Sequence, residues 1–68
     1  MEKLMLPAAE AAILVGVKRS TFYSLHSEGL LPGPIRLRGR VLWRVDDLKS
    51  WVAAGCPNRQ AFDALQKN

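Results

Sequence analysis

Arginine and lysine side chains concentrate in the middle of this 68-residue chain. Six of its ten basic residues lie between positions 18 and 44, where Glu28 is the only acidic residue. A guanidinium group donates paired hydrogen bonds to phosphate or to the edge of guanine, and an ammonium group attracts phosphate as a point charge. Because solubility requires net charge but not its clustering, the clustering predicts a polyanionic partner. The six residues are Lys18, Arg19, Arg36, Arg38, Arg40 and Arg44.

Two short helices joined by a tight turn are expected to position the first of these charges. The alanine-rich segment 8–14 follows Pro7 and favours a helix, with a buried face made by Ala8, Ala11, Ala12, Leu14 and Val15. Gly16 would end this helix with a positive φ. A second helix is predicted from about Lys18 to Glu28, with Phe22 and Leu25 facing inward and His26 at the margin.

An arginine-rich hairpin is predicted to follow. Residues 35–38 alternate apolar and basic, Gly39 stands at the tip, and residues 40–45 return with Val41, Trp43 and Val45 on one side. Apolar residues would face inward and arginines outward, with Leu42 as a partly exposed exception. A third helix would start at Asp46 as its N-cap, bury Leu48, Trp51 and Val52, and stop at Gly55.

Length and composition limit the remaining possibilities. The chain is long enough for one domain over residues 1–68, with a core over about 4–55 and a tail over 56–68 that forms a short helix or frays. We expect an α+β fold that is mainly α. No apolar run approaches a membrane span, and the single cysteine, Cys56, suits a reducing cytoplasm. His26 and Cys56 have no neighbours at metal-ligand spacing, so we expect no metal, cofactor or catalytic site.

The order of these segments resembles the small excisionase-like and AlpA-like DNA-binding proteins, which have the MerR-type winged helix-turn-helix fold. The similarity covers roughly residues 4–55 and is carried by the segments 6–12, 14–23, 28–32 and 43–48, by the arginine hairpin and by Trp51. It implies a compact winged helix-turn-helix: a helix-turn-helix, a two-stranded β-hairpin wing, a third helix and a possible short C-terminal helix.

In this fold the second helix reads bases and the hairpin contacts the backbone or the minor groove. The expected recognition-helix contacts are Lys18, Arg19, Ser20, Thr21, Tyr23 and Ser24, and the expected wing contacts are Arg36, Arg38, Gly39, Arg40 and Arg44. Arg19 is the candidate for paired contacts with guanine, and Lys18 the candidate for a phosphate. Tyr23 is equally compatible with packing and with DNA contact, whereas Trp43 and Trp51 are expected in the core.

The chain departs from the family pattern at four positions. Pro7 and Lys18 stand where the family has helix-capping residues, which predicts poorly capped helices. Ile13 replaces a commonly polar residue, and Ser24 replaces a frequent arginine, which predicts that one DNA contact is absent.

The resemblance implies a non-catalytic, sequence-specific binder of double-stranded DNA in the cytoplasm of a bacterium. As an excisionase it would bend attachment-site DNA, with neighbouring copies of itself and a tyrosine-type integrase as partners. As an AlpA-like regulator it would act on phage or integrase genes. A third possibility is a protein-interaction module that docks an integrase through Ile13, Leu42, Phe62 and Leu65. Neither a membrane nor a small-molecule substrate is expected.

Overall fold

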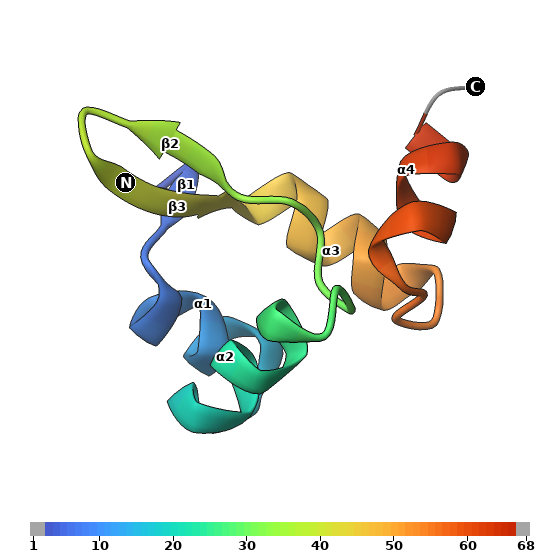
Figure 1. The fold of residues 1–68 in the computed structure, drawn as a ribbon, viewed down its shortest axis with the longest axis horizontal. Helices are drawn as coiled ribbons and strands as arrows, with labels where there is room; N and C mark the ends of the chain where they lie inside the picture. Colours follow the sequence, from blue (N-terminus) through green and yellow to red (C-terminus); the bar gives the residue numbers. More distant parts are fainter. Residues whose placement is uncertain (1–2, 67–68) are drawn as a thin grey trace.

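The computed structural model describes residues 3–66, so the ends of the predicted domain and tail, residues 1–2 and 67–68, lie outside the described residues. Within this range the chain forms an α+β fold of four helices and a three-stranded antiparallel sheet (Figure 1). The elements, in chain order, are β1 (Met5–Leu6), α1 (Ala8–Val15), α2 (Arg19–Ser27), β2 (Ile35–Leu37), β3 (Arg40–Arg44), α3 (Val45–Ala53) and α4 (Arg59–Gln66).

Helix α1 packs against α2 through small side chains. Ala8, Ala11 and Ala12 are buried, so the alanine face predicted from the sequence is confirmed. Leu14 was expected on that face, but 48% of it is exposed. The buried stripe of this short helix is narrow and centred on the alanines, which leaves Leu14 at its edge beside α3.

The turn between α1 and α2 forms at Gly16, as predicted. Gly16 has a φ of +96°, and its N–H donates to the carbonyl oxygen of Ala12 at 2.8 Å. The next N–H, from Val17, donates to the same oxygen at 3.0 Å, which completes the end of α1. Lys18 then occupies the N-cap position of α2. Residues 16–18 therefore connect the two helices, and α2 starts within one residue of its predicted position.

The sheet has the order β1–β3–β2 and contains one strand more than predicted. Met5 pairs with Arg44 and Leu6 with Trp43, so the residues before α1 extend the hairpin. On the other side of β3, Arg36 pairs with Val41 and Leu37 with Arg40. Since paired residues share a face, one sheet face carries Leu6, Arg36, Val41 and Trp43, and the other carries Met5, Ile35, Leu37, Arg40, Leu42 and Arg44.

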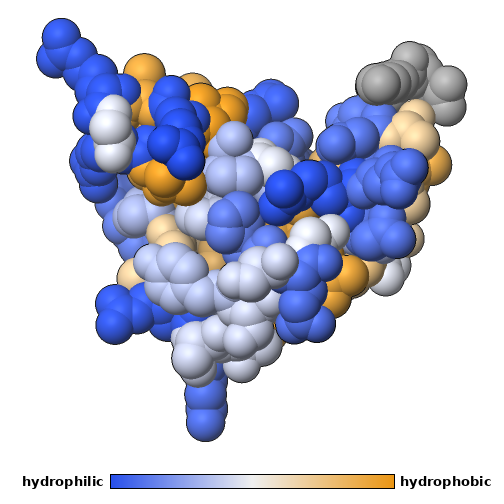
Figure 2. Space-filling view, viewed as in Figure 1, coloured by the Kyte–Doolittle hydropathy of each residue, from blue (hydrophilic) through white to orange (hydrophobic). Residues whose placement is uncertain are grey.

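This register corrects the predicted division of the hairpin into an apolar inside and a basic outside. Leu42 is buried, although it was expected to be partly exposed, and Val41, expected inside, is 38% exposed. Ile35 and Leu37 are also exposed. The hairpin projects beyond the core, so its outer half is covered on neither face, and Figure 2 shows hydrophobic surface over it.

Helix α3 begins two residues earlier than predicted. Arg44 holds the N-cap position, and Asp46, the predicted cap, lies in the first turn with Asp47. Leu48 and Trp51 are buried as expected, but Val52 is about half exposed. The predicted C-terminal stop is confirmed, because the helix ends at Ala53 just before Gly55.

The tail forms a docked helix, α4, which settles the alternative between a helix and a frayed end for residues 59–66. The Asn58 side chain accepts a hydrogen bond from the Ala61 N–H at 2.8 Å, and Phe62 is buried in the core. The core joins residues from every helix and from β3: Ala11, Phe22, Leu31, Trp43, Leu48, Trp51 and Phe62. Among residues 3–66, no helix has both the length and the apolar character that crossing a membrane requires.

Candidate nucleic-acid interface

The outward face of α2 carries the residues predicted to read DNA. Each of them is exposed, and half of the Tyr23 side chain is accessible. Arg19 and Tyr23 are four residues apart, which places them on the same flank of the helix, and Ser20 and Ser24 form the next row. Phe22, the buried residue of α2, lies opposite the row of Ser20 and Ser24, and its burial fixes this orientation. The predicted set is Lys18, Arg19, Ser20, Thr21, Tyr23 and Ser24.

The hairpin tip is a two-residue turn built from Arg38 and Gly39. Leu37 and Arg40 are the last paired residues, and φ is +51° at Arg38 and +79° at Gly39. Positive φ at both central residues is the requirement of a type I′ turn, whose twist matches that of the strands. Glycine takes this conformation without cost, but arginine does not, so the turn itself does not favour Arg38.

A hollow of about 370 Å³ separates α2 from the hairpin. We call it the α2–β3 hollow; its lining residues are Pro7, Ala8, Tyr23, His26, Val41 and Trp43. Arg36 shares the sheet face of Val41, and Arg19 shares the helix flank of Tyr23. One basic residue from each element therefore lies beside the same hollow. In Figure 1 the hairpin tip and the start of α2 lie on the side away from α4, at opposite ends of that side.

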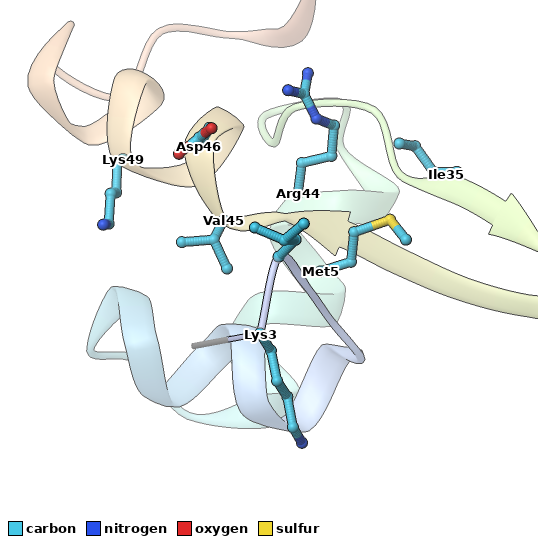
Figure 3. A pocket seen from close by; sticks show the side chains of 8 residues that line it. Lys3, Met5, Ile35, Arg44, Val45, Asp46 and Lys49 are labelled. Carbon is cyan, nitrogen blue, oxygen red and sulfur yellow. The ribbon is translucent and has the colours of Figure 1, made fainter. Parts of the chain in front are cut away.

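Arg40 and Arg44 lie on the other face of the sheet. Arg44 forms an ion pair with Asp47, Nη1 to Oδ1 at 3.2 Å, at the base of the hairpin. Figure 3 shows Arg44 and Ile35 around a second hollow, which Lys3, Met5 and Lys49 also line. The structure therefore separates Arg44 from the other predicted wing residues, whereas Arg40 stays next to the tip.

The cations on α2 and on the outer hairpin are free of carboxylate partners within residues 3–66. The ion pairs in this range are Lys3 with Glu10, at 2.8 Å, and Arg44 with Asp47. Five exposed basic side chains consequently keep their full charge for an external anion: Lys18, Arg19, Arg36, Arg38 and Arg40. Figure 2 shows hydrophilic side chains projecting at the hairpin and at the lower end of the molecule, where α2 lies.

Trp43 fixes the hairpin relative to α2. Its ring meets the Phe22 ring edge-on at a centroid distance of 4.9 Å and the His26 ring at 5.3 Å. Its indole N–H donates to the buried carbonyl oxygen of Pro32 at 3.1 Å. One β3 side chain thus contacts α2 twice and also holds the segment that leads from α2 to β2. The predicted core role of Trp43 is confirmed.

Arg59, which the sequence did not single out, ties α4 to the end of α2. The backbone N–H of Arg59 donates to the Gly29 carbonyl oxygen at 2.9 Å, and its side-chain Nε donates to the Leu31 carbonyl oxygen at 3.0 Å. Its Nη2 lies 3.2 Å from His26 Nδ1. Because a guanidinium only donates, Nδ1 accepts and the imidazole proton sits on Nε2. His26 is therefore a structural residue. Arg59 is 28 to 33 positions away in the sequence from these partners, so patterns among neighbouring residues do not reveal the contacts.

The apolar patch predicted for protein docking does not form as expected. Ile13 is 78% exposed, and Leu65 is also exposed, but Leu42 and Phe62 are buried. Other exposed apolar side chains, Leu14 and Val52, instead line a hollow between α1 and α3.

Comparisons of the chain with protein-family models, with curated proteins and with solved structures find no match.

Proposed function

We propose that this protein binds duplex DNA in a sequence-specific manner, without catalysis, through α2 and the β2–β3 hairpin. The observation that supports this most directly is the pairing of two elements across the α2–β3 hollow. Each element presents basic side chains that lack carboxylate partners within residues 3–66, and α2 has the dimensions to enter a major groove. Under this proposal the fold acts as a winged helix-turn-helix, as the sequence resemblance implies.

The residues divide into two roles under this proposal. Arg19 and its neighbours Ser20, Tyr23 and Ser24 meet base edges, because they occupy the outward face of α2. Lys18, Arg36, Arg38 and Arg40 meet phosphates. Arg44 is left out of this set, because Asp47 already neutralises it on the far side of the sheet.

Salt dependence and two alanine variants test the proposal. Four phosphate contacts predict that log K falls against log salt with a slope of about −3.6. Arg19→Ala should reduce binding to the preferred sequence more than binding to random duplex, because it removes a base contact. Arg38→Ala should weaken both about equally and bring the slope closer to zero by about 0.9. Fluorescence anisotropy over a salt series measures all of these quantities.

Lys49→Ala is the matched control, because Lys49 is an exposed cation on α3, outside the proposed surface. It should leave the slope unchanged. Equal losses of specificity from Arg19→Ala and Arg38→Ala would contradict the division of roles. Absence of binding to duplex DNA, even at low salt, would contradict the whole proposal.

For the biological role we propose an excisionase that bends attachment-site DNA and favours integrase-mediated excision. The outward face of α2 and the hairpin tip offer little surface for tight binding at one site, so neighbouring copies on adjacent sites would raise occupancy. An AlpA-like regulator would use the same contacts at a promoter. Footprinting separates the two, because clustered repeats at an attachment site support excision and a single promoter operator supports regulation.

A protein-interaction module is the second candidate function. The exposed Ile13, Leu14 and Val52 favour it, since they place apolar surface on α1 and α3, away from the α2–β3 hollow. If this were the only function, Arg19→Ala and Arg38→Ala would leave biological activity intact.

A further inference from the structure

The walls of the α2–β3 hollow are mostly hydrocarbon, although basic residues flank it. Pro7, Ala8 and Val41 contribute only carbon side chains. The Trp43 N–H is already donated to Pro32, and His26 Nδ1 already accepts from Arg59. The polar groups left for a ligand are the Tyr23 hydroxyl and His26 Nε2. A purely ionic ligand would gain little from such walls, so the hollow suits an uncharged group that lies between two anionic ones.

A DNA strand has this arrangement of an uncharged group between two anionic groups. If α2 occupies a major groove, the strand that borders the groove passes between α2 and the hairpin, because both elements approach the duplex from one side. Along that strand, charged phosphates alternate with deoxyribose rings whose exposed edge is largely C–H. Arg36 on the sheet face would meet one of these phosphates, while Arg19 on the helix flank reaches the bases. The sugar next to that phosphate would face Val41 and Pro7.

We propose that the α2–β3 hollow is a deoxyribose subsite that makes the surface selective for DNA over RNA. This inference rests on the proposed DNA-binding function. Ribose differs from deoxyribose by its 2′-hydroxyl, and this group distinguishes the two nucleic acids at a given site. A 2′-hydroxyl on this sugar would point at Val41 and Pro7 and away from the Tyr23 hydroxyl and His26 Nε2. It would lose water without gaining a hydrogen bond, so the hollow would reject it.

The test is a ribonucleotide scan of a DNA duplex. The best-binding duplex is first selected from a random pool, and single deoxynucleotides are then replaced by the corresponding ribonucleotides, one position at a time. Burial of one unpartnered hydroxyl predicts about a tenfold loss of affinity at one or two positions and little change elsewhere. A neutral methylphosphonate at one of the two phosphates that flank each sensitive sugar should also weaken binding, through the lost contact with Arg36.

A variant inside the hollow links the effect to its wall. Val41→Thr keeps the size and β-branching of the side chain but adds a hydroxyl that pairs with the 2′-hydroxyl. It should reduce the ribonucleotide penalty at the sensitive position at least threefold and leave the salt slope unchanged. Ile35→Thr is the matched control: Ile35 is 37% exposed, against 38% for Val41, and lies on the other sheet face. It should leave the scan unchanged.

The outcomes separate the two proposals. Failure to select any duplex would overturn both DNA binding and the subsite. A selected duplex with a flat ribonucleotide scan, or a penalty that Val41→Thr and Ile35→Thr change equally, would overturn the subsite and leave DNA binding in place. A penalty that only Val41→Thr relieves would support the subsite.

Discussion

Arg38 adds a positive charge to the hairpin tip but has an unfavourable backbone conformation in the turn. Its φ of +51° lies in the left-handed region, where asparagine and glycine are favoured and arginine is strained. The side chain at this position projects from the hairpin tip and has no ion-pair partner within residues 3–66. The local backbone does not account for a long cationic side chain here, but the phosphate contact that we propose would.

We therefore predict that Arg38→Asn stabilises the fold and weakens DNA binding. Relief of the left-handed strain should raise the free energy of unfolding by about 0.5 kcal/mol. That gain corresponds to a rise in Tm of about 2–4 °C for a domain of this size. Thermal melting followed by circular dichroism measures the stability, and anisotropy measures the binding.

Arg40→Asn is the control for this change. It removes the same charge from the neighbouring strand residue, but Arg40 has no positive φ to relieve. The strain argument fails if the two asparagine variants melt at the same temperature.

At the scale of the element, the N-terminus of α2 is poorly stabilised. Lys18 holds the N-cap position with extended backbone angles and makes no side-chain hydrogen bond to the free N–H groups. Pro7 leaves α1 uncapped in the same way. The poor capping predicted from the departures at these two residues is thus confirmed. Lys18 and Arg19 also place positive charge at the positive end of the helix dipole.

Lys18→Ser should consequently stabilise α2. A serine hydroxyl accepts a hydrogen bond from an N–H of the first turn, which is worth about 1 kcal/mol, and the like-charge repulsion with the dipole disappears. Urea denaturation should show a higher midpoint, together with weaker DNA binding. Lys49→Ser, a change of an exposed lysine inside α3, offers no cap and should lower the midpoint slightly. A lower midpoint for Lys18→Ser would contradict the capping argument.

Helix α4 acts on α2 through Arg59. Removing the guanidinium with Arg59→Met leaves the partly buried Leu31 carbonyl without its donor, so we expect a loss of about 1–2 kcal/mol in the free energy of unfolding. The His26 ring also loses the donor to Nδ1.

Nuclear magnetic resonance of the His26 ring nitrogens tests this contact directly. The parent chain should show neutral imidazole protonated at Nε2, and Arg59→Met should populate the Nδ1 tautomer. Gln60→Met, at an exposed neighbour in the same helix, should alter neither stability nor tautomer. An unchanged tautomer in Arg59→Met would exclude the proposed hydrogen bond.

At the scale of the whole molecule, the sequence predicts what depends on neighbours along the chain. Gly16 and Gly29 mark where α1 and α2 end, and the alternation in residues 35–38 correctly places Ile35 and Leu37 on one face. These features follow from backbone sterics and side-chain period. The alternation does not show whether the rest of the molecule covers that face, so the predicted burial was right for Trp43 and wrong for Ile35, Leu37 and Val41.

Features that join distant segments could not be predicted in the same way. The pairing of Met5 with Arg44 adds a strand too short to show any period. The contacts of Arg59 with His26, Gly29 and Leu31 depend on the position at which α4 packs in the folded chain. For the candidate site, the exposed α2 residues and the hairpin tip were identified from the sequence. The α2–β3 hollow was not, because it exists only between elements.

The position of Trp43 has a practical consequence. Its indole lies against Phe22 and His26 on one wall of the α2–β3 hollow, whereas Trp51 donates its N–H to Pro57 at the start of the segment before α4. The chain therefore contains two tryptophan fluorophores at separate places. Replacing either indole by phenylalanine leaves an emission signal that follows the hollow or the α4 junction alone, without an attached dye.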